Sequence, residues 1–351
     1  MAYMRIKGYE RFAGAVYGEL VKAIRSQRAR GSAANAKIDL HPDAVWIGIQ
    51  LDPVKKAVEE SNPVHCVRER EEVTYSGVGG RSARSMVGRT RVFHPNDMGV
   101  ISESTKDSAD VAITTFTPAD PTLVNVRGIT RRFDYANDGI SSVLSSPALL
   151  SPAADRDDPK RVNFIPIQHS SGTFAKGYRP TPLRTGYERV LAHRTDDMFA
   201  AAAEQDGTVT SLTDRGMVVT YADGSTHSLQ LGRRFGRGGG LMFPHQLQTT
   251  FQQNATFKKG DILVYNERYF EPDLLTQGQV VWKAGLLVRT AIMETPDTLE
   301  DSSAISASVA TELETQITYV RDIVVAFDQT IHGLVTEGSA VEIDSILCTI
   351  E

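Results

Sequence analysis

Residues 216–231 read GMVVTYADGSTHSLQL, and this stretch determines the architecture that we expect for the surrounding chain. Apolar and polar side chains alternate up to Asp223-Gly224, and the alternation resumes beyond this dipeptide. A period of two is the pattern of a half-buried strand, and Asp-Gly tolerates the positive φ angles of a tight turn. The stretch therefore predicts a β-hairpin, within a region that is strand-rich from Glu188 onward.

Two neighbouring stretches carry different expectations. Residues 233–240 read RRFGRGGG, and consecutive glycines have no side chains to bury, so we expect a flexible basic loop. Residues 346–351 read ILCTIE, which is a strand-like run. Because a strand needs a neighbour with which to pair, we expect its partner strand on another polypeptide.

Helices are expected near the N-terminus. Apolar residues recur at helical spacing over residues 9–30, and Gly31-Ser32 then provides a stop. A second helix is expected over residues 53–60, because Pro53 would occupy its first turn and Asn62-Pro63 would end it.

Composition excludes several classes of protein. The chain has 351 residues, 41% of them hydrophobic and 23% charged, and no apolar run is long enough to span a membrane. An apolar signal region is also missing, so we expect a soluble intracellular protein. Cys66 and Cys348 lie too far apart in sequence for a zinc motif or a disulfide framework, and we interpret them as free thiols.

Common catalytic motifs are absent from the sequence. It contains no phosphate-binding G-x-x-x-x-G-K-[ST], no G-x-G-x-x-G that leads into a helix, and no G-x-S-x-G. No two histidines have the spacing of helical metal ligands. The acidic pair Glu300-Asp301 has two open interpretations, a helix cap or a functional pair, because adjacent carboxylates on a strand point to different sides.

A local basic segment stands out against the net charge of −5. Four arginines without an intervening acid follow a glycine-rich stretch: Arg81, Arg84, Arg89 and Arg91. Such a segment suits phosphate binding, although an exposed surface loop would have the same composition.

Short motifs in one order over about residues 48–350 carry a family resemblance. They are Ser61-Asn62-Pro63-Val64, Val73 to Gly80 with Gly88, Arg91, His94-Pro95 and Gly99, Ile165-Pro166-Ile167-Gln168-His169, Thr185-Gly186-Tyr187-Glu188-Arg189-Val190, Lys259-Gly260-Asp261-Ile262-Leu263, and Leu299-Glu300-Asp301-Ser302. Together they resemble the β subunit of bacterial multisubunit RNA polymerase. The chain is similar to a central fragment of a split β subunit, as in giant tailed bacteriophages.

The resemblance implies roles for particular residues. Glu300 and Asp301 would lie beside the incoming nucleotide and the second Mg²⁺, and the basic segment from Arg81 to Arg91 would follow the nucleic-acid path. The catalytic Mg²⁺ would be held by an Asp-Phe-Asp-Gly-Asp loop on a β′ fragment. The family's nucleotide-contacting arginine after the His169 motif is missing, and Arg179 or Arg184 would substitute for it.

The fold class implied is mixed α/β and β-dominated, RNA polymerase β-like. Its expected parts are a helical N-terminal segment over 1–70, a fork-loop and lobe-connecting region over 71–180, part of a double-psi β-barrel over 181–310, and the flap root over 311–351.

The implied function is nucleotidyl transfer in RNA synthesis on a DNA template, only after assembly with other β and β′ fragments. Template DNA, RNA and nucleoside triphosphates would be the further partners, and no membrane is involved. The location would be the cytoplasm of the phage-infected bacterial cell, or the virion if the enzyme is packaged. The alternative from another class is a non-catalytic, β-rich phage structural or assembly protein.

Overall fold

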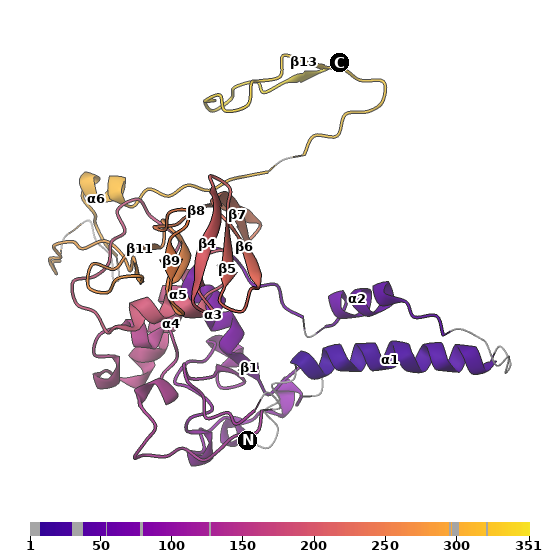
Figure 1. Cartoon of the computed structure of the whole chain (residues 1–351). Coiled ribbons are helices and arrows are strands. Elements are labelled where there is room, and N and C mark those ends of the chain that lie inside the picture. Colours follow the sequence, from indigo (N-terminus) through magenta and orange to yellow (C-terminus); the bar gives the residue numbers. More distant parts are fainter. Residues whose placement is uncertain are drawn as a thin grey trace.

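The computed structural model describes residues 8–29, 38–53, 55–77, 80–125, 128–294, 296, 302–320 and 322–351. Helices come first along the chain, and strands dominate residues 200–282, which confirms a mixed α/β class with a helical N-terminal part (Figure 1). Among the described residues, no helix combines the length and apolar character needed to cross a bilayer.

Two N-terminal helices lie side by side and project from the rest of the molecule (Figure 1). They are α1 (Gly8–Ala29) and α2 (Pro42–Gln50). The Arg11 guanidinium donates two hydrogen bonds of 2.7 Å to the Asp52 carboxylate, which ties α1 to the chain just beyond α2. The helix predicted over residues 9–30 is confirmed.

The helix predicted over residues 53–60 is wrong. Residues 55–59 have no regular structure, and the next helix is α3 (Pro63–Glu71). Asn62 is its N-cap, because the Asn62 Oδ1 accepts hydrogen bonds from the backbone N–H groups of Val64 (2.7 Å) and His65 (3.4 Å). The Asn62-Pro63 pair therefore begins a helix where the sequence indicated an end.

The middle of the chain is built mainly of turns between short elements. Strand β1 (Glu72–Thr74) pairs antiparallel with β2 (Thr114–Phe116). Short 3-10 turns cover Ala83–Ser85, Gly88–Thr90, Pro95–Asp97, Ser108–Asp110, Ile140–Ser142, Ala148–Leu150 and Ala154–Arg156. Two helices follow, α4 (Pro159–Ser171) and α5 (Tyr187–Arg194).

Two four-stranded sheets form the centre of the molecule and curl into a half-barrel. One has the order β3-β10-β8-β7, and the other has the order β6-β5-β4-β9. Their strands are β3 (Ala200–Ala202), β4 (Gly207–Thr213), β5 (Gly216–Tyr221), β6 (Thr226–Gln230), β7 (Gly232–Gly238), β8 (Leu241–Gln248), β9 (Thr256–Phe257) and β10 (Ile262–Asn266). Both sheets contribute to one apolar core, which includes Val209, Met217 and Leu263.

The hairpin predicted around Asp223-Gly224 is confirmed. Strands β5 and β6 pair antiparallel, with Met217 opposite Leu229, and both of these side chains are buried. Within the turn dipeptide only Gly224 has a positive φ angle, of +83°. The Gly224 N–H donates to the Tyr221 carbonyl at 2.9 Å, so the turn depends on the glycine.

The expectation of a flexible loop over residues 233–240 is wrong. Strand β7 pairs with β8 over its whole length, from Gly232 opposite Leu247 to Gly238 opposite Leu241. The two-residue connection is Gly239-Gly240, and both glycines have positive φ angles, of +56° and +79°. This is the backbone of a two-residue hairpin turn, so the glycine run closes a hairpin.

The C-terminal part departs from the half-barrel. After β11 (Phe270–Pro272) and β12 (Val280–Trp282) come the short helix α6 (Ala307–Glu312) and the strands β13 (Ile331–His332) and β14 (Thr349–Ile350). Strand β14 pairs antiparallel with β13. The partner of the C-terminal strand therefore lies on this chain, which corrects the expectation of a partner on another polypeptide.

Candidate nucleic-acid and nucleotide contacts

Motifs that are far apart in the sequence meet in the structure. The Asn62 side chain is buried, and its Nδ2 donates hydrogen bonds to the carbonyls of His169 (2.8 Å) and Gly172 (2.6 Å). The Asn62-Pro63 motif therefore lies directly against the motif over residues 165–169. Because one amide group caps α3 and holds the end of α4, both segments have a fixed relative position.

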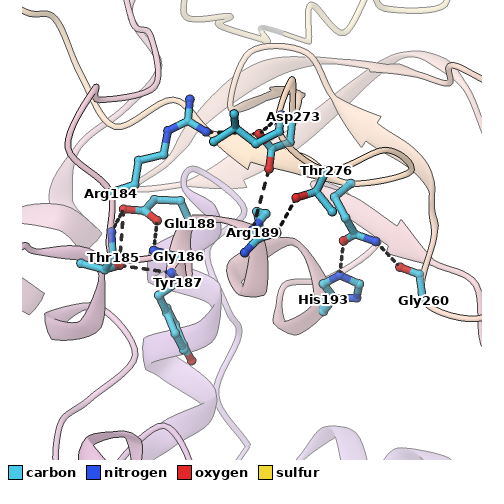
Figure 2. A network of polar contacts seen from close by, with 12 residues as sticks. Arg184, Thr185, Gly186, Tyr187, Glu188, Arg189, His193, Gly260, Asp273 and Thr276 are labelled. Atoms are coloured by element: carbon cyan, nitrogen blue, oxygen red, sulfur yellow. Dashed lines mark hydrogen bonds and ion pairs between the residues drawn. The ribbon is translucent and has the colours of Figure 1, made fainter.

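The motif over residues 185–190 is organised by one buried carboxylate (Figure 2). Glu188 is 2% exposed, and its two oxygens accept hydrogen bonds from the backbone N–H groups of Thr185 (3.0 Å) and Gly186 (2.8 Å). Gly186 has a φ angle of +90°. A carboxylate at this place satisfies N–H groups at the start of α5, so Glu188 positions the helix.

The same helix contacts the motif over residues 259–263. A hydrogen bond of 2.7 Å joins the His193 Nε2 to the Gln279 side chain, whose Nε2 donates to the Gly260 carbonyl at 2.9 Å (Figure 2). Two of the motifs are thus bonded directly through Asn62, and two others are linked through His193 and Gln279. Helices α3, α4 and α5 carry three of these four motifs.

The two candidate nucleotide-contacting arginines differ in their surroundings. Arg184 forms an ion pair of 3.2 Å with Asp273, whose side chain is 2% exposed and also lies 3.8 Å from the Arg189 guanidinium (Figure 2). The charge of Arg184 is therefore compensated within the chain.

Arg179 has no carboxylate partner among the described residues. Its guanidinium donates to the carbonyls of Lys176 (3.3 Å) and Tyr178 (2.8 Å), which leaves its positive charge uncompensated. Arg179 borders a pocket of about 460 Å³, lined also by His169 and Trp282, and none of the described residues that line this pocket is acidic. Of the two arginines, Arg179 is the one that can meet an anion.

The basic segment lies in exposed turns. Arg84 and Arg89 are exposed and form no hydrogen bond or ion pair within the part of the chain that the structure describes. Arg81 is exposed as well. Arg91 instead supports the local backbone, because its guanidinium donates to the carbonyls of Met86, Ala109 and Val111 at 3.0–3.1 Å. The structure thus separates a structural arginine from the arginines that face solvent.

Glu300 and Asp301 lie outside the described residues. The next described helix, α6, has Ser306 as its N-cap, whose hydroxyl accepts from the Val309 N–H at 3.3 Å. Across the described ranges, no three His, Cys, Asp or Glu side chains come together as a potential metal site.

Sequence reasoning missed one buried ionisable group beside these motifs. Glu71, at the end of α3, accepts hydrogen bonds from the Ser146 hydroxyl and from Arg194 at 3.3 Å. Burial raises the pKa of Glu71 to about 7. Its partners lie 75 and 123 positions away, so no local pattern could have indicated the contact.

A second missed group is His245 on β8. The Asn266 Nδ2 donates to its Nδ1 at 2.9 Å, so its Nε2 carries the proton and donates to the Glu60 carbonyl at 2.7 Å. Burial lowers the pKa of His245 to about 4, which keeps the imidazole neutral. This histidine fastens the chain before α3 onto the half-barrel and has no exposed reactive atom.

Comparison with known proteins bears on the N-terminal part. No curated protein matches the chain. Residues 1–83, about a quarter of the sequence, match the family model described as Bacteriophage RNA polymerase. The matched range contains α1, α2, α3 and the Asn62-Pro63 motif. Over residues 1–83 the chain is therefore similar to the Bacteriophage RNA polymerase family.

Proposed function

We propose that this chain is a β-subunit fragment of a DNA-directed RNA polymerase and that it acts only after assembly with other β and β′ fragments. The observation that carries the proposal is the family match over residues 1–83. The matched range ends within the β-like motifs, and Asn62 from that range bonds directly to His169 and Gly172 outside it. The α3 end of the matched range therefore packs directly against the motif over residues 165–169.

The proposed reaction is nucleotidyl transfer, in which the RNA 3′ oxygen bonds to the α-phosphorus of a nucleoside triphosphate and the bond to pyrophosphate breaks. Phosphoryl transfer depends mostly on positioning and on compensation of charge. Glu300 and Asp301 would lie next to the second Mg²⁺, and the catalytic Mg²⁺ would be held on β′. Arg179 is the stronger candidate for a contact with the triphosphate, because Asp273 already compensates Arg184.

The half-barrel is proposed as part of a double-psi barrel that strands of a second fragment would complete. The exposed arginines Arg81, Arg84 and Arg89 would lie along the nucleic acid and hold phosphates without reading sequence. Residues 311–351 would form the root of the flap.

The first test is co-purification. A tagged chain, co-expressed with the remaining fragments, should recover the polypeptide that carries the Asp-Phe-Asp-Gly-Asp loop, and the complex should extend RNA on a DNA template. Recovery of homo-oligomers or particles without RNA synthesis would instead support the structural alternative and overturn the proposal.

The second test concerns the acidic pair. Glu300→Ala combined with Asp301→Ala should slow nucleotide addition on the order of 100-fold, because charge near the reacting phosphates is lost. The control is Asp107→Ala with Asp110→Ala, which removes two exposed carboxylates from a surface turn. Equal assembly of both double variants, measured by gel filtration, separates catalysis from folding. Parental rates in the Glu300-Asp301 variant would show that the pair has no role in the reaction.

A further inference from the structure

We propose that the exposed face of β7 binds single-stranded nucleic acid through alternating arginine and aromatic side chains. Arg233, Phe235 and Arg237 occupy alternate positions of β7, so they share one face of the sheet. All three are exposed, whereas Arg234 is half-buried and Gly236 and Gly238 are buried. The strand therefore presents a cation, a ring and a second cation in a row of about 13 Å.

The hairpin holds this row in place. Opposite the three side chains lie Gln246, Pro244 and Met242 of β8. The outer edge of β7 is covered near Arg237, because the Glu60 N–H donates to the Arg237 carbonyl at 2.8 Å. Gly236 has no room for a side chain, since a Cβ atom there would lie 2.4 Å from the Glu60 carbonyl oxygen. The buried face of β7 is therefore held against Glu60, whereas the face that carries Arg233, Phe235 and Arg237 is exposed to solvent.

The Phe235 ring, at the centre of the row, already stacks against the Arg233 guanidinium, and a nucleic-acid base could stack on its exposed part. The Arg233 guanidinium lies over the Phe235 ring at 4.9 Å from its centroid. Phe235 is 38% exposed, so part of the ring remains available. Proteins that bind single strands combine cationic grooves with aromatic rings on which bases stack.

A second arginine–aromatic pair lies near Arg233. The Arg268 guanidinium lies 4.8 Å from the Phe174 ring centroid, and electrostatic repulsion from Arg233 contributes to a lowered pKa of Arg268, with burial the larger cause. The Glu267 N–H donates to the Gln246 carbonyl at 3.0 Å, which connects this corner to β8. The Arg268–Phe174 pair therefore lies within electrostatic reach of Arg233.

The charges of the row are available for phosphates. Within the described ranges, Arg233, Arg237 and Arg268 form no ion pair with a carboxylate, although Glu267 lies within electrostatic reach of Arg268. Nearby Glu59 and Glu60 accept from the backbone N–H groups of Gly239 (2.9 Å) and Arg237 (3.3 Å). Exposed rings favour single strands, because the bases of a duplex are stacked on each other.

This inference rests on the proposed function for the identity of the strand, which would be a separated DNA strand or the nascent RNA. Its test uses the full chain alone and a fluorescent thymidine oligonucleotide of about 12 nucleotides. Binding would be measured by fluorescence anisotropy over a series of salt concentrations. The slope of log K against log salt concentration should become less steep by about 1.4 when Arg233→Gln is combined with Arg237→Gln. Each phosphate contact with a single strand contributes about 0.7 to this slope.

The matched control is Arg215→Gln, which removes an exposed arginine in the turn before β5. This control should leave both affinity and salt dependence unchanged. Phe235→Leu should weaken binding about tenfold without altering the salt dependence, because it removes stacking and no charge. Unchanged unfolding midpoints would show that the variants fold.

Two outcomes would overturn the inference. The first is that the Arg233-Arg237 variant binds the oligonucleotide as the parental chain does. The second is that a polyglutamate peptide displaces the oligonucleotide and that Phe235→Leu has no effect on binding. This second result would identify the β7 face as an electrostatic surface for acidic proteins. If the assembled complex transcribes but the isolated chain does not bind the oligonucleotide through β7, this inference alone is refuted. Binding through β7 by a chain that never enters such a complex would refute the proposed function alone.

Discussion

The half-barrel and the C-terminal arm, residues 319–351, have similar apolar strand-like sequences and opposite burial. In the half-barrel, Met217, Val219 and Leu263 are fully buried. In the arm, Phe327 is 107% exposed and Ile343 is 93% exposed. Figure 1 shows the arm, in yellow, extending away from the two sheets. Apolar composition therefore does not decide burial, because a strand needs both a paired neighbour and a second sheet to cover it.

The arm has a paired neighbour strand but, in the part of the chain that the structure describes, no second sheet to cover it. Strands β13 and β14 have two residues each, and an isolated two-stranded hairpin is at best marginally stable in water. Strands β4, β5 and β6 instead pair over longer stretches and share a core with the other sheet. The half-barrel thus has the contacts for independent stability, and the arm does not.

The two regions also differ in charge. The arm contains six acidic residues and one basic residue, so its net charge equals the −5 of the whole chain. The rest of the sequence is neutral overall, with its exposed arginines in places such as β7. Because negative charges repel phosphates, the arm is a less favourable surface for an anion than the β7 face.

The largest effect should come from matched leucine truncations in the two regions. Leu263→Ala should lower the free energy of unfolding by about 2–5 kcal/mol, because it leaves a cavity in the core of the half-barrel. Leu334→Ala should change it by less than about 0.5 kcal/mol, because this side chain is 71% exposed. Urea unfolding measures both. Equal losses would mean that the arm is packed in solution.

A somewhat smaller effect on stability should come from the protonation of a buried carboxyl, compared with an exposed one in the arm. Burial raises the pKa of Glu71 from 4.5 to about 7, so the folded chain retains a proton that the unfolded chain releases in this range. The stability from this carboxyl is complete below about pH 4.5 and is lost as the pH rises to about 7. Between pH 5 and pH 8 the parental chain should lose about 2–3 kcal/mol that Glu71→Gln does not lose.

The control for this pH dependence is Glu342→Gln in the exposed arm. It should unfold with the parental pH profile when urea midpoints are compared at pH 5 and pH 8. If Glu71→Gln also follows the parental profile, the carboxyl of Glu71 does not carry the pH dependence.

The smallest effect distinguishes the two turns. Gly224→Ala should destabilise the chain by about 1–2 kcal/mol, because a Cβ is strained at a φ angle of +83° even though the space around it is open. Gly333→Ala, at +64°, should leave the main unfolding transition unchanged, because its hairpin is not part of the half-barrel. Thermal unfolding followed by circular dichroism compares them. A shift of the main transition by the second variant would contradict the independence of the arm.

Local patterns predicted the elements that local physics determines. The apolar period of residues 9–30 was sufficient for α1, and the alternation around Gly224 was sufficient for the β5–β6 hairpin. The same reasoning failed at residues 233–240, because a glycine run permits a loop and a tight hairpin turn equally. It failed at Asn62-Pro63 as well, since this pair can end one helix or cap another.

The candidate site was predictable only as a set of segments. The motifs named the stretches around Asn62, His169 and Thr185, and the resemblance ordered them. Asp273 compensates the charge of Arg184 from 89 positions away, and the residues next to Asp273 or next to Arg184 in the sequence do not indicate this contact. Long-range ion pairs depend on which chain segments the fold brings together, and their sequence spacing carries no information about this.

The sequence by itself determined the alternation of the β5–β6 hairpin, the period of α1 and the order of the polymerase-like motifs, because these depend on neighbouring side chains and backbone preferences. Only the tertiary structure decided which arginines remain uncompensated, which carboxylates are buried and which apolar strands are covered. Those properties arise from contacts between distant segments, where burial changes both the cost of a charge and the gain from an apolar side chain.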